Sequence, residues 1–289
     1  MRVLVTGGAG FVGTNLIKKL LSEGHRVVSL DNYSTGKKEN ELDIKGVQYF
    51  DVDLLDTFDY DFFIDKPDII FHLAAIARIQ PSFEHPDLTY HANVSTTLNV
   101  LEWARKKKCP VVFSGSSSSN GDKFANPYTL SKSHAENLVK LYNKIYDIPT
   151  TICRFYNVYG PYQLTEGDYC TLIGIFERLK KENKVFTVTG DGTQRRDFTH
   201  VDDIVDGLIK CHENLDKSNG HIFELGRGKN YSVSDIVDAF GEDEVEYLPK
   251  RPGEMRETLC TDTKAREMLG WTPKKDVIEF IKETYILDK

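Results

Sequence analysis

The chain has 289 residues, 40% of them hydrophobic, so it can bury a full core and form one large α/β domain with a smaller lobe. Its formal net charge of -7 argues against a nucleic-acid-binding surface, which needs clustered Lys and Arg. The five cysteines are scattered without a CxxC pair, and no apolar run reaches bilayer length, so we expect a cytoplasmic protein with reduced thiols and no membrane partner.

The first element is a strand, a glycine turn and a helix. Arg2–Thr6 is rich in β-branched residues, the turn GGAGFVG follows at 7–13, and the apolar spacing after it is helical. The strand begins so early that we expect no signal peptide. Such a turn lets a pyrophosphate approach backbone amides at the helix N-terminus. The expected dinucleotide contacts are Gly7, Gly10, Phe11, Val12 and Gly13.

A second strand, Arg26–Leu30, ends in Asp31, eighteen residues after Gly13. A carboxylate at this point can accept hydrogen bonds from both ribose hydroxyls and would repel a 2′-phosphate. The sequence therefore favours NAD over NADP as cofactor. The alternative is a structural glycine turn without a ligand.

Three further strands continue the same pattern. We expect them at Val47–Phe50, at Asp68–Ala75 and at Pro110–Phe113, with a long helix over Pro86–Lys108 between the last two. Asp53 follows the first of the three, where it could contact an adenine amino group or be a solvated turn residue. The last strand is followed by a serine-rich segment, 114–121, which has no G-x-S-x-G nucleophile motif.

Tyr128 and Lys132 lie four residues apart at the start of the next predicted helix, on one face. A lysine ammonium there should lower the pKa of the phenol toward neutrality and make Tyr128 a general base for an alcohol. An ordinary helix with a surface tyrosine and lysine is the alternative. The position after the serine segment favours the catalytic interpretation.

These segments together resemble the extended short-chain dehydrogenase/reductase superfamily, in its NAD-dependent sugar epimerase/dehydratase branch, and most closely the UDP-glucose 4-epimerases. The resemblance covers nearly the whole chain. Its motifs are GGAGFVG (7–13), DNYSTG (31–36), HLAA (72–75), YxxxK (128–132), RFYNVYGP (154–161), GDGTQRRDF (190–198), RPGE (251–254) and LGWTP (269–273).

The resemblance implies a Rossmann-like doubly wound parallel sheet with a smaller mixed α/β C-terminal lobe. We expect an NAD-binding domain of residues 1–157 plus 198–226, and a sugar-nucleotide lobe of 158–197 plus 227–289. It also implies a homodimer formed through helices 86–108 and 128–146. The further cofactor contacts that it implies are Asn32, Ser34, Gly36, Asp53, Leu54, Leu73, Ala74, Ala75, Ala77, Asn93, Tyr128, Lys132 and Phe155.

The resemblance places the catalytic serine at Ser116, beside the base Tyr128 and Lys132. Dehydratases of this branch follow the serine position with Asp-Glu and decarboxylases with Ser-Glu, whereas this chain has Ser117-Ser118. Elimination then lacks its acid and base, so 4-epimerisation through a 4-keto sugar is the expected reaction. Two departures affect the expected sugar: Tyr128 follows Gly121 by only seven positions, and Asn120 replaces the family's tyrosine.

For the substrate, the resemblance implies a UDP-hexose. Asn157, Arg196 and Arg251 are expected at the diphosphate. Thr258, a small residue, is expected at the sugar 2-position, which would admit N-acetyl groups. The remaining implied substrate contacts are Ser116, Ser117, Leu172 and Glu254.

Two other interpretations stay open. One is an epimerase or reductase acting on a GDP- or dTDP-linked sugar, and the other is a non-catalytic NAD-binding sensor or scaffold. A metal site at His200, Asp202 and Asp203 is not expected, because these residues open a predicted helix whose N-terminus favours acidic side chains.

Overall fold

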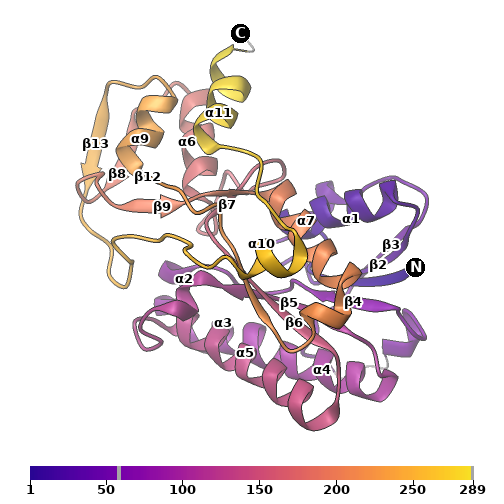
Figure 1. Ribbon diagram of the computed structural model, residues 1–289. Helices are drawn as coiled ribbons and strands as arrows, with labels where there is room; N and C mark the ends of the chain where they lie inside the picture. The colour runs from indigo at the N-terminus through magenta and orange to yellow at the C-terminus, as the bar shows by residue number, and fades with distance from the viewer. Residues whose placement is uncertain (57–59, 288–289) are drawn as a thin grey trace.

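The computed structural model describes residues 1–56 and 60–287. Within these residues, a parallel sheet of seven strands forms the centre of the molecule, in the order β11-β6-β5-β4-β1-β2-β3 (Figure 1). Its strands are β1 (Arg2–Thr6), β2 (Arg26–Asp31), β3 (Val47–Asp51), β4 (Ile69–His72), β5 (Val111–Ser116), β6 (Thr150–Phe155) and β11 (Ile222–Leu225). This confirms the predicted Rossmann-like α/β class.

Helices cover both faces of the sheet. One face packs on α1 (Phe11–Ser22), α7 (Val201–Glu213) and α10 (Lys264–Leu269). The other face packs on α4 (Thr96–Lys107) and α5 (Pro127–Tyr146). The shorter helices beside them are α2 (Ile79–Glu84), α3 (Pro86–Tyr90), α8 (Leu215–Ser218), and the 3-10 turns η1 (Lys38–Asn40), η2 (Tyr60–Phe62) and η4 (Ser117–Asn120).

The helix predicted over 86–108 is present, with an irregular middle. Its two α-helical parts, α3 and α4, are joined by a π-helical turn, η3 (His91–Ser95), whose flanking residues keep right-handed helical backbone angles. The positive charges of its last turn precede Lys108, which has a left-handed φ of 52° and ends the helix.

The small lobe has its own hydrophobic cluster, built around Phe176, Phe186 and Phe240. It forms the upper part of the molecule in Figure 1, where the C-terminus lies. Its elements are β7 (Val158–Tyr159), α6 (Leu172–Lys181), β8 (Phe186–Thr189), β9 (Arg195–Asp197), β10 (Thr199–His200), β12 (Asn230–Ser232), α9 (Val233–Ala239), β13 (Val245–Leu248), α11 (Val277–Lys282) and η5 (Glu283–Leu287).

Two sequence expectations need correction. The serine segment was expected after the fifth strand, yet β5 continues to Ser116 because 114–116 pair in register with 153–155 of β6. The sugar-nucleotide lobe expected over 227–289 includes α10, yet this helix packs on the large sheet. Trp271, directly after α10, is 1% exposed in the same cluster, and its Nε1 donates to the carbonyl of Asp203 at 2.8 Å.

No helix among the described residues has the length and apolar character that a membrane span requires. The same residues contain no cluster of metal-ligating side chains. His200, which was weighed as a metal ligand together with Asp202 and Asp203, caps α7 with its ring. Its Nδ1 accepts from the Asp202 amide at 3.1 Å. The five cysteines are unpaired thiols.

Candidate active site

A single cleft of about 1360 Å³ runs along the carboxyl ends of β1, β2, β4 and β5 and continues under the small lobe. Ligands of doubly wound sheets bind at this edge. The predicted site residues that line the cleft are Gly7, Gly10, Phe11, Val12, Gly13, Asp31, Asn32, Ser34, Asp53, Leu54, Leu73, Ala74, Ala75, Ala77, Ser116, Ser117, Tyr128, Lys132, Phe155, Asn157, Leu172, Arg196, Arg251, Glu254 and Thr258.

The glycine turn is packed too tightly for any side chain. Gly7 has a φ of +73°, and a Cβ there would lie 2.8 Å from the amide nitrogen of Ala74. A Cβ on Gly13 would lie 2.1 Å from the carbonyl oxygen of Gly7. The turn therefore exposes bare backbone at the N-terminus of α1, which fits a pyrophosphate.

Asp31 is held at the end of β2 by two backbone amides. Its Oδ2 accepts from Ala9 at 2.9 Å and its Oδ1 from Tyr33 at 2.8 Å. Burial raises the pKa of this carboxyl, and the two hydrogen bonds lower it. Each oxygen keeps a further lone pair, so the carboxylate can also accept from a ribose diol.

Asn32 and Asp53 are brought together on the same wall, with Asn32 Nδ2 donating to Asp53 Oδ2 at 3.0 Å. Two predicted cofactor contacts are not among the lining residues. Gly36 lies behind the glycine turn, where its Cβ would meet Ala9. Asn93 is 2% exposed and holds the loop after β4, accepting from the Ile76 amide at 2.8 Å and donating to the Ile76 carbonyl at 3.0 Å.

Tyr128 lies in the first turn of α5, next to the end of β5. The side chain of Asn126 caps this helix by accepting from Thr129 N at 2.8 Å, and Pro127 fits the first turn because it needs no amide proton there. Tyr128 is half-buried, and it lines the cleft together with Ser116. The Ser116 hydroxyl contacts Ser118 Oγ at 2.9 Å.

The electrostatics of Tyr128 differ from the sequence expectation. Burial raises the pKa of the phenol, while Ser116 and the charge of Arg78 act to lower it. Lys132 instead donates from Nζ to the Ser114 carbonyl at 2.6 Å and lies 4.7 Å from the Phe113 ring centroid. Burial lowers the pKa of Lys132 to about 8. The predicted downward shift of the Tyr128 pKa by Lys132 is therefore wrong for this arrangement.

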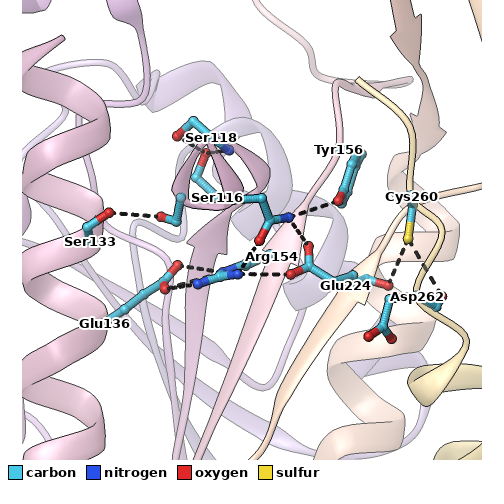
Figure 2. Close-up of polar contacts among 11 residues, drawn as sticks. Ser116, Ser118, Ser133, Glu136, Arg154, Tyr156, Glu224, Cys260 and Asp262 are labelled. Carbon is cyan, nitrogen blue, oxygen red and sulfur yellow. Dashed lines mark hydrogen bonds and ion pairs between the residues drawn. The ribbon is translucent and has the colours of Figure 1, made fainter. Parts of the chain in front are cut away.

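A buried charge network (Figure 2) joins α5 to β6 and β11, farther along the helical face that carries Tyr128 and Lys132. Arg154 on β6 pairs with Glu136 at 2.6 Å and with Glu224 on β11 at 3.0 Å. Asn120 accepts from Arg154 and donates to Glu224 Oε2 and the Tyr156 hydroxyl, each at 3.0 Å. The network joins η4, α5, β6 and β11, so it fixes the helix that carries Tyr128 and Lys132.

The predicted substrate residues meet on the small-lobe side of the cleft. Asn157 donates from Nδ2 to the Asp197 carbonyl at 2.9 Å and to Thr258 Oγ1 at 3.0 Å. Both of its amide protons are thus used within the protein, and its diphosphate contact stays a prediction. Arg196 lies 3.8 Å from Glu254, whereas Arg251 is exposed at the rim.

Two groups of residues at this site were not predicted from the sequence. Glu136 lies four residues after Lys132 on the same helical face, and Arg154 opens the RFYNVYGP motif, so spacing could have indicated both. For Arg78 the sequence gives a weaker indication, which is its position in the loop after β4. A basic residue in a short loop at the carboxyl end of a central strand is well placed to reach the ligand cleft.

Comparisons with known proteins agree with this geometry. Residues 3–226 match the NAD dependent epimerase/dehydratase family. The UDP-glucose 4-epimerase of Mycolicibacterium smegmatis is 32% identical over 98% of this chain and 97% of its own. UDP-glucuronic acid decarboxylase 3 of Arabidopsis thaliana is 31% identical over 95% of this chain and 85% of its own.

A solved structure extends the agreement to the fold. The UDP-glucuronic acid 4-epimerase of Bacillus cereus, in complex with UDP-glucuronic acid and NAD, superposes with a TM-score of 0.89 at 28% identity. The alignment covers 99% of this chain and 98% of that one. The Gly7 turn and the Asp31 carboxylate fit NAD as the cofactor on their own geometry.

Proposed function

The chain belongs to the NAD-dependent epimerase/dehydratase family of nucleotide-sugar enzymes, and from this we propose that it inverts C4 of a UDP-hexose, with UDP-glucose and UDP-galactose as the interconverted pair. The observation that carries the proposal is that Tyr128 lines the same cleft as Ser116, the residue that ends β5. It supports proton transfer at a sugar hydroxyl beside the cofactor site.

In the proposed mechanism, Tyr128 takes the proton of the 4-hydroxyl, and Ser116 hydrogen-bonds the same oxygen. Bound NAD supplies the hydride acceptor for C4 and the hydride donor for the return step. The resulting 4-keto sugar turns over in the cleft. Tyr128 then returns its proton to O4, so the enzyme ends each cycle unchanged and no net oxidation occurs.

Lys132 and the Arg154 network hold the elements that carry Ser116 and Tyr128 in place. Lys132 fixes the Ser114 carbonyl, two residues before Ser116. The Glu136–Arg154 pair holds α5 against β6. Arg196 and Arg251 provide cations for the diphosphate, and Leu172 and Thr258 line the same cleft.

The relatives include decarboxylases as well as epimerases, and the residues after Ser116 distinguish between these reactions. The two residues after Ser116 are serines, and Ser118 uses its hydroxyl to contact Ser116 at 2.9 Å. A serine there cannot serve as the carboxyl acid or base that elimination requires. This favours epimerisation over dehydration and decarboxylation.

The proposal is tested by incubating the purified protein separately with UDP-glucose, UDP-N-acetylglucosamine, UDP-glucuronic acid and GDP-mannose, and identifying the products by NMR. We expect UDP-galactose from UDP-glucose without added cofactor. Release of carbon dioxide from UDP-glucuronic acid would favour a decarboxylase, and turnover that requires NADPH would favour a reductase. No conversion of any substrate would favour a non-catalytic NAD-binding protein.

A further inference from the structure

One segment of the small lobe reaches over the cleft to the large domain. It follows β13 and consists of residues 251–254, which we call the strap. Arg251, Gly253 and Glu254 line the cleft, and the two charged residues among them are predicted substrate contacts. On the side of the small lobe, Glu254 lies 3.8 Å from Arg196 of β9. The strap therefore connects predicted substrate contacts of the small lobe to the large domain.

Two side chains of the large domain hold the strap. Asn126, which is buried, donates from Nδ2 to the carbonyl of Gly253 at 3.3 Å. Gln80 of α2 donates from Nε2 to the carbonyl of Pro252 at 3.0 Å. The approach is close, because a Cβ on Gly253 would lie 2.9 Å from the ring of Phe83. The strap is thus packed against α2 and against the residues before α5.

Both hydrogen bonds connect the strap to the first turn of α5, which carries Tyr128. Asn126 caps this helix, with Oδ1 accepting from the Thr129 amide at 2.8 Å. Gln80 lies two residues before Ser82, whose hydroxyl oxygen accepts from the Tyr128 amide at 3.1 Å. The two polar atoms of the Asn126 side chain therefore have different partners: the oxygen binds the helix, and the nitrogen binds the strap.

The short loop before α5 brings Asn126 to the strap. Tyr128 follows Gly121 by only seven positions. A Cβ on Gly121 would lie 3.6 Å from Cε of Met255, the residue directly after the strap. The loop therefore lies beside the strap segment at its first residue, Gly121, and again near its end, at Asn126.

We propose that Asn126 is a positioning residue for the nucleotide sugar, which holds the strap on the helix of the proposed base. The inference rests on the proposed function, because it assigns how Arg251 is kept at the diphosphate. With the strap fixed, Arg251 and Glu254 keep their places at the cleft before the substrate binds, and less ordering has to accompany binding. Asn126 takes no part in the proton transfer.

The test replaces Asn126 by aspartate and by serine in the full-length protein. Both replacements keep a side-chain oxygen that can cap α5, and both remove the amide that donates to Gly253. We expect KM for UDP-glucose to rise at least about threefold, because substrate binds only the fraction of molecules with the strap in place. The change in kcat should be less than about twofold, because the helix cap is kept.

Two further measurements need no turnover. Calorimetric titration with UDP should show a dissociation constant raised by the same factor. Trypsin should cleave the native protein faster after Lys250, the exposed residue before the strap, because cleavage follows the population in which the strap is released.

The control variants address charge and folding. Asn126→Ser adds no charge, so agreement between the two variants excludes repulsion of the ligand by the new carboxylate. Asn183→Asp and Asn183→Ser, at an exposed position just after α6, are the matched controls and should change none of these quantities. Thermal unfolding checks that each variant is folded.

The outcomes separate this inference from the proposed function. Weaker binding of UDP together with faster cleavage, but no epimerisation of any substrate, would support the role of Asn126 and overturn the function. Unchanged KM, affinity and cleavage in the folded variants overturn the role. A lower kcat at unchanged KM would assign Asn126 to the cap of α5 alone, and weaker binding without faster cleavage would make it a direct substrate contact. Either result overturns the positioning role, as does faster cleavage with an unchanged affinity for UDP.

Discussion

The guanidinium of Arg154 and the carboxylate of Glu136 lie 2.6 Å apart, two helical turns after Tyr128 on the same face of α5, with the Glu136 side chain only 2% exposed. Glu136 follows Lys132 by one helical turn, and Lys132 follows Tyr128 by one. The pair therefore fixes the helical face that presents the proposed base, and its charges are removed from water together with their partner Glu224.

Breaking this pair should destabilise the fold strongly. Arg154→Met leaves the buried carboxylates of Glu136 and Glu224 without their cation, and we expect a loss of about 3–5 kcal/mol in the free energy of unfolding. Glu136→Gln should cost less, because Arg154 keeps its pair with Glu224. Urea denaturation measures it, and the double variant should lose less than the sum of the two. Glu23→Gln, which breaks the exposed Lys19–Glu23 pair, is the control and should cost less than about 1 kcal/mol. Additive losses would contradict the pairing.

Tyr128→Phe should remove the general base and leave the fold intact. We expect kcat to fall by about 10²–10⁴, because the proton of the 4-hydroxyl has no other positioned acceptor. NMR of the products measures turnover, and NAD released on denaturation measures cofactor retention, which should stay as in the wild type. Tyr146→Phe, at the exposed end of the same helix, is the matched control. Full activity in Tyr128→Phe would rule out the mechanism.

Thr258 tests the proposed tolerance for N-acetyl sugars. Its hydroxyl accepts from Asn157 Nδ2 at 3.0 Å and from the Asp197 amide at 3.2 Å. Thr258→Tyr should fill the space at the sugar 2-position, so kcat/KM should drop at least about tenfold more for UDP-N-acetylglucosamine than for UDP-glucose. Thr258→Ser keeps the hydroxyl and should keep both activities. Equal losses with the two substrates would count against the assignment.

Gly7→Ala should release the cofactor. The same replacement at Gly24 separates the effect of backbone strain from that of a steric collision. Gly7 and Gly24 both have left-handed backbones, with φ of +73° and +81°, so alanine strains either by about 1–2 kcal/mol. Only at Gly7 does the added Cβ collide, 2.8 Å from Ala74 N, whereas nothing lies within 4 Å at Gly24. We expect NAD to be lost from Gly7→Ala and kept by Gly24→Ala. Retention by both would refute the turn as the pyrophosphate seat.

Local patterns predicted the large domain well. The strands predicted at Arg2–Thr6 and Val47–Phe50 and the glycine turn between α1 and the first strand depend on neighbouring residues and on periodicity, and the structure confirms them. The small lobe was harder, because β7 and β10 have only two residues each and depend on pairing with distant segments. Patterns of this length carry no periodicity to detect.

At the site, too, features that depend on local spacing could be predicted, and features that depend on distant segments could not. Tyr128 and Lys132 share a helix, so their spacing predicted a common face. The direction of the Tyr128 pKa could not be predicted, because it is set by burial, by Ser116 and by Arg78, which come from separate elements. Lys132 reaches the Ser114 carbonyl instead of the phenol, and only the packing of α5 on β5 determines that choice.

His72 should make the protein sensitive to acid. Its ring is 1% exposed at the end of β4, between Thr6 Oγ1 at 2.7 Å and Thr97 Oγ1 at 3.0 Å. Burial lowers the pKa of His72 to about 3, with a further contribution from the charge of Lys132. The folded state therefore binds this proton less readily than the unfolded state, in which the pKa is about 6.5.

The sign of the pH dependence follows. Above about pH 6.5 neither state protonates the ring, and below it only the unfolded state does, so stability falls as the pH drops toward 3. The loss in the free energy of unfolding is on the order of 5 kcal/mol at most.

Urea denaturation between pH 7 and 4.5 measures the free energy of unfolding at each pH. Plotted against pH, this free energy should have a shallower slope for His72→Gln than for the wild type. His200, whose pKa burial lowers to about 4, adds to the acid sensitivity of both proteins and cancels in the difference. His91→Gln controls for the replacement at an exposed site. Parallel curves for His72→Gln and the wild type would show that the ring titrates equally in both states.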